Sequence, residues 1–257
     1  KQKDGRKILP IRRIITAGDD VCFVTEGRIG VECARLYLEF LSRKVNSVDQ
    51  EGYSACAGVA IVHRKYPFYK AYELSEMLCS NAKKYIATLG GEEAGAKNSA
   101  IDWHLEFGEI QDDLKETRRQ YITEDGNRME LRPYLLCSMD GLDEKDPLRR
   151  FDSFRKLMAL LEAEDTDDGE KYARGKLKNL RAAIKEGETQ TELYLSRNSI
   201  AELSLTGYQD IYTSPDMKKL FQGEAQQRKT FAKTADGVNR SLFFDAIELM
   251  DTYLSLD

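Results

Sequence analysis

Residues 11–25, which read IRRIITAGDDVCFVT, are the stretch from which the fold of the chain is inferred. Two short runs rich in β-branched residues, Ile11–Thr16 and Val21–Thr25, flank the four-residue segment AGDD. Glycine and aspartate are typical of tight hairpin turns. Apolar residues at successive positions of both runs predict strands that are covered on both faces. We therefore expect a β-hairpin with two adjacent carboxylates, Asp19 and Asp20, at its turn.

Helical and strand patterns alternate downstream of this hairpin. Apolar residues recur every three to four positions in two segments, which predicts helices over 29–41 and over 67–90. Between them, the small-residue run Tyr53–Val62 predicts a buried central strand, whose Gly58 leaves room for a helix to pack closely. Apolar and polar residues alternate over 101–108, which predicts a strand with one dry and one wet face.

The pattern changes to helices after about residue 139. Before that point, Asp125-Gly126 between two β-rich runs predicts a second hairpin over 121–131. Beyond it, helices are expected over 147–161, 171–186, 189–205 and 238–254, and a short helix opens at Ser214-Pro215. Residues 164–170 are expected to form an acidic loop or the start of a helix.

The predicted fold class is therefore α+β. We expect a ferredoxin-like palm over 1–138, which is an antiparallel sheet with helices on one face, followed by an all-helical domain over 139–257. The order of elements in the first part completes such a palm only if one further strand and helix are added before residue 1. The first strand of the palm is thus expected to be missing from this sequence.

The composition excludes several classes of protein. A chain of 257 residues is long enough for a sizeable core. The net charge is −5, with 21 basic and 21 acidic residues up to residue 138, and 18 and 23 after it. This balance argues against a general nucleic-acid coat, although residues 1–13 hold six basic side chains and one acid. No apolar run approaches the ~18 residues that span a membrane, and no signal peptide is visible.

The five cysteines predict small core residues rather than a metal site. None forms a Cys-x-x-Cys pair, and the sequence has two histidines, so a structural zinc site is not expected. Each cysteine has apolar neighbours. The sequence therefore indicates reduced thiols in a cytoplasmic protein.

The segment AGDD at 17–20 is the sharpest chemical feature of the sequence. Two carboxylates at a hairpin turn can converge on one cation, and Mg²⁺ prefers one or two carboxylates together with substrate phosphates. Such ions, Mg²⁺ or Mn²⁺, stabilise phosphoryl transfer. The small residues Ala17 and Gly18 would let a nucleotide approach the backbone. The alternative is a plain turn, in which aspartate bonds its own backbone.

Several stretches of the chain, in order, carry a family resemblance. RRIITAGDDVCFV at 12–24 resembles the GGDD hairpin in the second palm domain of the CRISPR polymerase, the large subunit of type III CRISPR effector complexes. ACAGVAIVHRKYPFYKAYELSEMLCSNAKKY at 55–85 resembles that family's strand, its His-x-Lys-x-Pro turn and its helix ending in Ala-Lys. SAIDWH at 99–104 resembles the strand that follows, and SLFFDAIELMDTYL at 241–254 is similar to the helical domain after the palm. Diguanylate cyclases of the GGDEF type and class III nucleotidyl cyclases share the palm at greater distance.

The resemblance implies a nucleotidyltransferase that joins ATP, or another nucleoside triphosphate, into a cyclic oligonucleotide messenger in antiviral defence. Asp19 and Asp20 match the family's metal-binding acids, and Gly18 matches the second glycine of its motif. Lys83 matches the lysine of the Ala-Lys pair, which in palm cyclases reaches nucleotide phosphates. The sequence departs from the family in two places: Ala17 replaces the first glycine, and the carboxylate of the first palm strand has no counterpart.

The remaining candidates are weaker. His63 and Lys65 follow the strand at 53–62 in a cationic turn that could contact phosphate, and a solvated loop is the simpler interpretation. Lys83 likewise has a structural alternative, a basic helix end that favours the helix dipole. His104 lies between two acids on the expected wet face of its strand, where an exposed surface or a helix-covered polar face is a more common outcome than metal or acid–base chemistry.

Two function classes therefore stay open. The first is the nucleotidyltransferase, whose active site would pair this palm with a second palm domain or with a second copy of the chain. The second is a catalytically degenerate palm that binds a nucleotide, RNA or CRISPR-type subunits without turnover. The absent first-strand carboxylate and Ala17 motivate the second class. Neither class involves a membrane partner.

Overall fold

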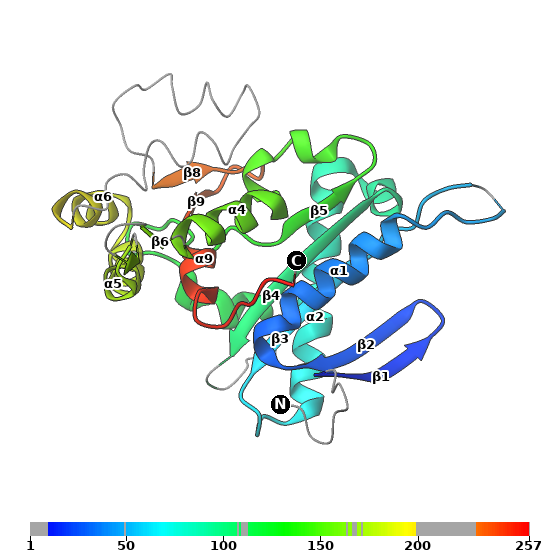
Figure 1. The fold of residues 1–257 in the computed structure, drawn as a ribbon. Helices are drawn as coiled ribbons and strands as arrows, with labels where there is room; N and C mark the ends of the chain where they lie inside the picture. The colour runs from blue at the N-terminus through cyan, green and yellow to red at the C-terminus, as the bar shows by residue number, and fades with distance from the viewer. Residues whose placement is uncertain are drawn as a thin grey trace.

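A mixed α and β architecture confirms the predicted α+β class in this computed structural model (Figure 1). The residues that it describes are 10–48, 50–106, 108, 113–162, 164–165, 169–170, 172–198 and 230–256. The first part contains β1 (Ile11–Ala17), β2 (Asp20–Thr25), α1 (Gly30–Ser42), β3 (Cys56–Val62), α2 (Phe68–Gly90), β4 (Asn98–Glu106), α3 (Leu114–Thr117) and β5 (Tyr134–Ser138). The second part contains α4 (Phe151–Glu162), β6 (Glu164–Asp165), β7 (Gly169–Glu170), α5 (Arg174–Glu186), α6 (Glu188–Arg197), β8 (Phe231–Lys233), β9 (Asn239–Ser241) and α9 (Phe244–Leu249).

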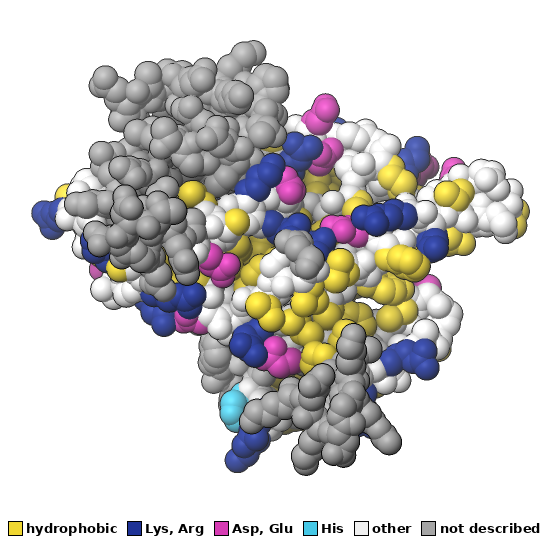
Figure 2. All heavy atoms as spheres, in the orientation of Figure 1, with side chains coloured by type: hydrophobic (Ala, Val, Ile, Leu, Met, Phe, Trp, Pro, Cys, Tyr) yellow, Lys and Arg dark blue, Asp and Glu magenta, His cyan; other side chains and the backbone are white. Residues whose placement is uncertain are grey.

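The predicted N-terminal hairpin is confirmed. β1 pairs antiparallel with β2, and Ala17 is the partner of Asp20 beside the turn. The expectation that both strands are covered on both faces is wrong, because the hairpin forms its own two-stranded sheet and most of its side chains are exposed. Figure 2 shows hydrophobic side chains gathered over the hairpin and α1, and Ile11, Val24 and Phe40 are among the exposed ones.

The larger sheet has the order β3-β4-β5. β3 and β4 are parallel, and β4 and β5 are antiparallel, so the expected fully antiparallel sheet is wrong. The parallel pair arises because the 35 residues between the two strands contain the long helix α2, and a crossover of this length returns the chain to the same end of the sheet. β3 lies at the edge of its sheet and is half-buried, which corrects the prediction of a buried central strand at 53–62.

Helices cover both faces of this sheet, which corrects the expectation of helices on one face. On one face, Ala57, Val59 and Ile61 of β3 pack against the core cluster that includes Val31, Ala34 and Leu38 of α1. On the other face α2 packs so closely that a Cβ atom at Gly58 would overlap the backbone oxygen of Ser75. The predicted role of Gly58 in close helix packing is therefore confirmed.

The helices predicted over 29–41 and 67–90 are also confirmed, as α1 and α2. Their apolar stripes bury Val31 and Leu38 of α1, and Leu74 and Leu78 of α2, against the two faces of the sheet. Gly91, with φ of 82°, ends α2 in a conformation that favours glycine.

The part of the chain after residue 139 is not all-helical. Besides α4, α5 and α6, it holds two short hairpins, β6–β7 in the acidic segment 164–170 and β8–β9. The predicted helix over 238–254 is wrong at both ends: residues 239–241 pair with β8, and the helix α9 spans only Phe244–Leu249. A strand bridge from Arg240 to Arg128 holds this segment extended.

Other sequence predictions are confirmed in part or lie outside the described residues. The hairpin expected over 121–131 is reduced to one bridge between Ile122 and Arg128 around a turn at Gly126. α6 ends at Arg197, and the continuation to 205 and the helix expected at Ser214-Pro215 are outside the part that the structure describes.

One hydrophobic cluster joins both parts of the chain. Trp103 of β4 is fully buried, and its ring stacks on Tyr134 with centroids 5.3 Å apart. Phe151 and Phe154 of α4 contact the same ring, and the cluster extends to Phe244 of α9. Within the described residues, no helix combines the length and apolar composition needed to cross a membrane.

Candidate functional site

The turn of the N-terminal hairpin presents its two carboxylates to solvent. Gly18 has φ of 62° at the first turn position, as a type II′ turn requires, and Asp19 occupies the second. Asp20 opens β2 opposite Ala17. Both aspartates are exposed, and their carboxylates make no hydrogen bond or ion pair within the part of the chain that the structure describes. The capping interactions typical of a plain aspartate turn are thus not formed by these side chains.

Lys83 lies on α2, exposed and close to two cysteines. Burial raises the pKa of Cys56, the first residue of β3, to about 11, and the positive charge of Lys83 acts against this rise. The Cys79 Sγ atom donates to the backbone oxygen of Cys56 at 3.3 Å. Lys83 therefore faces the beginning of β3 from one turn beyond Cys79.

The charges of Asp20 at the hairpin turn and of Lys83 both act on Cys79. Burial raises the pKa of the Cys79 thiol, Lys83 opposes the rise, and Glu76 and Asp20 add to it. A charge influences a titrating group in this way when it lies within a few ångströms to about a Debye length. The carboxylate of Asp20 and the ammonium of Lys83, predicted from separate motifs, thus both act on the thiol of Cys79.

α2 contributes a continuous stripe to this region. Tyr72, Glu76, Cys79 and Lys83 follow one another at spacings of four, three and four residues, which places them on one helix face. Glu76 raises the pKa of Tyr72, and burial and Asp20 add smaller contributions. We define the hairpin–α2 surface as Asp19, Asp20, Tyr72, Glu76, Cys79 and Lys83.

Sequence reasoning missed three members of this surface, Tyr72, Glu76 and Cys79, the last of which was interpreted only as a core residue. The signal was present, because counting back from Lys83 in helical steps reaches Cys79, Glu76 and Tyr72. What the sequence did not show is that the charge of Asp20 reaches this face of α2, at Tyr72 and Cys79.

The donor set of the hairpin–α2 surface fits a divalent cation that is shared with a ligand. The described residues contain no group of three or more Asp, Glu, His or Cys side chains arranged to hold a metal ion. Mg²⁺, however, is often bound through one or two carboxylates and completes its shell with phosphate oxygens and water. Asp19 and Asp20, which are exposed and unpaired among the described residues, match that type of site.

His63 and Lys65 are not brought together with Lys83. Lys83 faces Cys56 at the start of β3, whereas His63 and Lys65 follow Val62 at its end. A strand of this length spans roughly 20 Å at ~3.3 Å per residue. The His63 Nδ1 atom accepts from the backbone N–H of Lys65 at 3.3 Å, and both side chains are exposed.

His104 is fully buried, so its strand face is not wet, and the alternative of a helix-covered polar face is confirmed. α2 covers that face of β4, where the amide of Asn81 donates to Asp102 at 2.8 Å. Burial, followed by the charges of Arg132 and Arg118, lowers the pKa of His104 to about 3. The imidazole is therefore neutral, and its 3.2 Å contact with Glu106 is a hydrogen bond and not an ion pair.

Asp102, the other acid beside His104, is also occupied. Its carboxylate accepts from Arg118 at 2.8 and 3.1 Å, and both side chains are buried. This pairing removes the carboxylate from metal or acid–base chemistry. The strand β4 thus supplies internal structure, and the candidate chemistry stays at the hairpin–α2 surface.

Neither a scan against models of known protein families nor a search of curated proteins found a match to this chain.

Proposed function

We propose that the protein is a palm-type nucleotidyltransferase that acts on ATP or another nucleoside triphosphate at the hairpin–α2 surface. The observation that supports it most strongly is the pair of exposed carboxylates at the hairpin turn, which make no hydrogen bond or ion pair among the described residues. A carboxylate and a lysine whose charges both reach Cys79 suit a metal-bound triphosphate, because the acids hold the cation and the ammonium binds phosphate.

Each residue of the surface has a distinct role in this proposal. Asp19 and Asp20 would hold Mg²⁺ or Mn²⁺, which supplies charge stabilisation to the reacting phosphate. Lys83 orients the phosphates as a point charge. At Gly18 a Cβ atom would meet nothing within 4 Å, so the backbone of the turn is open to an approaching nucleotide. Ala17 adds one methyl group at the exposed strand end, in place of the family's first glycine.

The reaction class has a direct readout. A ribose hydroxyl displaces pyrophosphate from the α-phosphorus of the triphosphate, so each new phosphodiester bond releases one pyrophosphate. A cyclic oligonucleotide is the product that the family resemblance implies. A second palm, from another domain or another copy of the chain, would supply the second nucleotide.

The decisive test replaces both turn acids. Asp19→Asn combined with Asp20→Asn is expected to lower pyrophosphate release by about 10³-fold or more, because charge stabilisation by metal ions and fixed groups usually contributes most to the rate of such reactions. The protein is incubated with each of the four nucleoside triphosphates and Mg²⁺ or Mn²⁺, and pyrophosphate is measured. Glu92→Gln combined with Glu93→Gln is the matched control, because these adjacent exposed acids follow the far end of α2.

Two results would contradict the proposal. The first is unchanged pyrophosphate release from the Asp19 and Asp20 double variant. The second is no release by the unsubstituted protein with any of the four triphosphates and either metal ion.

A second candidate function is a degenerate palm that binds nucleotide without turnover. The observation that favours it is the separation of the hairpin from the three-stranded sheet: β2 and β3 do not pair with each other. A turn that is not anchored in the larger sheet holds its carboxylates less rigidly than catalysis needs. Equilibrium dialysis with ATP and Mg²⁺ separates this candidate, since it predicts binding without pyrophosphate. RNA and CRISPR-type subunits are further partners of this second candidate.

A further inference from the structure

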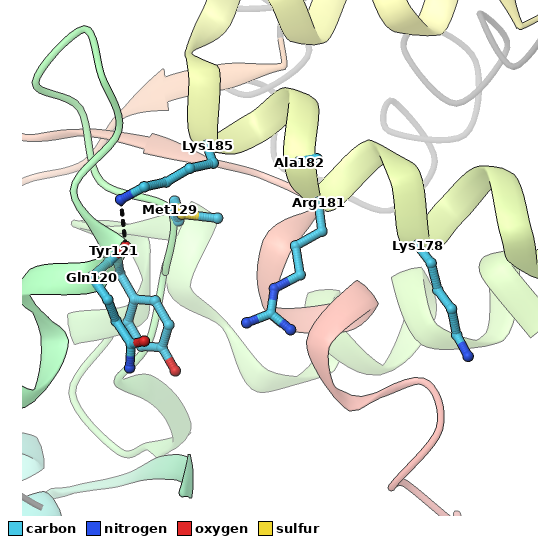
Figure 3. Close-up of a pocket in the computed structure, with 7 residues that line it drawn as sticks. All are labelled: Gln120, Tyr121, Met129, Lys178, Arg181, Ala182 and Lys185. Atoms are coloured by element: carbon cyan, nitrogen blue, oxygen red, sulfur yellow. Dashed lines mark hydrogen bonds between the residues drawn. The ribbon is translucent and has the colours of Figure 1, made fainter. Parts of the chain in front are cut away.

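A cavity of about 340 Å³ lies between the loop that precedes β5 and the helix α5. Its size falls in the range of small-molecule sites, which begins at about 300 Å³. One wall carries Tyr121 and Met129, and the other carries Lys178, Arg181 and Lys185 of α5 (Figure 3). Among the described residues, no acidic side chain lines the cavity.

The basic wall comes from one face of α5. Lys178, Arg181 and Lys185 are spaced by three and four residues and project from the helix on the same side. The Lys178 Nζ atom lies 2.7 Å from a carboxylate oxygen of Asp251. Lys185 donates to the backbone oxygens of Gln120 and Ile122 at 2.6 and 2.5 Å, and Figure 3 marks the bond to Gln120. Both lysines are thereby held at the rim.

Arg181 differs from the two lysines because its guanidinium has no carboxylate partner among the described residues. Its central carbon lies 5.6 Å from the ring centroid of Phe244, on the side of α9. Figure 3 shows the guanidinium pointing across the cavity toward Tyr121. A planar guanidinium with free N–H groups is the side chain best suited to bidentate phosphate binding.

The opposite wall carries Gln120 beside the largely buried side chains of Tyr121 and Met129, whose small exposed surface is apolar. The Tyr121 hydroxyl donates to a buried oxygen of Glu248 at 2.8 Å, and the ring lies 5.1 Å from the Phe244 ring. Tyr121 and Met129 are each almost fully buried by the protein, so their positions are fixed before any ligand binds. Preformed walls lower the entropic cost of binding.

We propose that this cavity binds a small phosphate monoester with an apolar or aromatic substituent. Arg181 contacts the phosphate, Lys178 and Lys185 add positive charge, and the organic group lies against Tyr121 and Met129. The site is distinct from the hairpin–α2 surface, and the inference does not depend on the proposed nucleotidyl transfer.

The test measures binding of phenyl phosphate by isothermal titration calorimetry, without divalent cations and at about 0.15 M salt, where long-range surface attraction is screened. Arg181→Gln is expected to weaken binding by about tenfold or more, since a hydrogen bond to a charged group contributes about 1.5–3 kcal/mol. Lys176→Gln is the matched control and is expected to change it less than about twofold. Lys176 is exposed on the same helix, bonds to the Asn198 carbonyl and does not line the cavity.

Additional ligands and variants test where phenyl phosphate binds. Phenyl phosphate should bind more tightly than inorganic phosphate, because the apolar wall contacts its ring. Arg181→Lys should retain part of the affinity, and the thermal unfolding temperature verifies that each variant folds. The double variant Asp19→Asn and Asp20→Asn should bind phenyl phosphate normally, even if it has lost nucleotide turnover.

Three outcomes would overturn the proposal. Phenyl phosphate does not bind, or Arg181→Gln and Lys176→Gln weaken binding equally, which indicates diffuse attraction to a basic helix. In the third, Lys83→Gln weakens binding as much as Arg181→Gln does, which moves the site to the hairpin–α2 surface.

Discussion

Two groups of carboxylates in this protein have opposite surroundings. At the hairpin turn, Asp19 and Asp20 are exposed and their side chains have no partner in the described part of the chain. At α9, Asp245 and Glu248 are buried and both accept from the Nη1 atom of Arg132, at 2.8 and 2.6 Å. The first pair is available to bind a ligand, whereas the second is already bonded to Arg132 inside the protein.

Both buried carboxylates accept hydrogen bonds from more than one residue, whereas the Nε and Nη2 atoms of Arg132 are buried without a partner among the described residues. Asp245 also accepts from the backbone N–H groups of Leu131 and Arg132 and from the Tyr134 hydroxyl, each at 2.9 Å. Burial by itself lowers the pKa of Arg132. The negative charges of Glu248 and Asp245 raise it by more, so the pKa of the guanidinium lies well above its usual value. Such a network ties α9 to the chain before β5, because an unpaired buried charge would be costly.

The largest expected effect is the loss of stability when Arg132 is removed from the buried carboxylates Asp245 and Glu248. Arg132→Met leaves two buried carboxylates without their cation, so the free energy of unfolding should fall by about 3–5 kcal/mol. Urea denaturation measures it. Arg119→Met is the control: its ion pair with Glu116 is exposed, so its removal should cost about 0–1 kcal/mol. Equal losses from the two variants would show that burial does not distinguish the two pairs.

The second effect concerns His104, which borders the same network through Tyr121. Its pKa of about 3 in the folded protein is below the value of 6.5 expected for an unfolded chain. Between these values the unfolded chain binds a proton that the folded protein does not, so folding stability is full above pH 6.5 and falls as the pH drops. The expected slope is about 1.4 kcal/mol per pH unit below pH 6.

Urea denaturation between pH 4 and 8 checks this slope in the unsubstituted protein and in His104→Gln. The variant lacks the titrating group, so its stability should depend less on pH by that amount. Parallel curves for the two proteins would mean that His104 is already protonated when folded, or is not buried.

The smallest expected effect is the change in activity when Lys83 of the hairpin–α2 surface is replaced. Lys83→Gln should lower kcat/KM for pyrophosphate release by about 10–100-fold, the equivalent of one charged hydrogen bond of about 1.5–3 kcal/mol. The neighbouring Lys84→Gln is the control, since Lys84 is exposed on the next helix position. Neither variant should change the free energy of unfolding by more than about 0.5 kcal/mol. Equal activity of the two variants would remove Lys83 from the proposed site.

Local sequence patterns predicted the elements whose formation is local. The turn at Gly18, the long helix after Pro67 and the close packing at Gly58 follow from turn chemistry, helical periodicity and the lack of a side chain. The two turn aspartates of the candidate site could be predicted from the sequence, because their position depends on four consecutive residues.

Predictions were wrong for two segments whose structure depends on contacts with residues far along the chain. The alternation around His104 looked like a half-wet strand, but β4 lies between two other strands with α2 over its polar residues. The apolar run 242–254 looked like one helix continuing from 238, but backbone pairing with β8 and with Arg128 holds Asn239–Ser241 extended. In both cases a partner far along the chain overrode the local pattern.

The sequence by itself determined the hairpin, its two aspartates and the helix that carries Lys83, because turns and amphipathic helices are specified by neighbouring residues. The tertiary structure decided which carboxylates are available for chemistry. Arg132 and Arg118 neutralise the buried acids Asp245, Glu248 and Asp102. The packing of α2 places Glu76 and Lys83 where their charges, like that of Asp20, act on Cys79. Burial and charge pairing are properties of the folded surface, and no stretch of neighbouring residues encodes them.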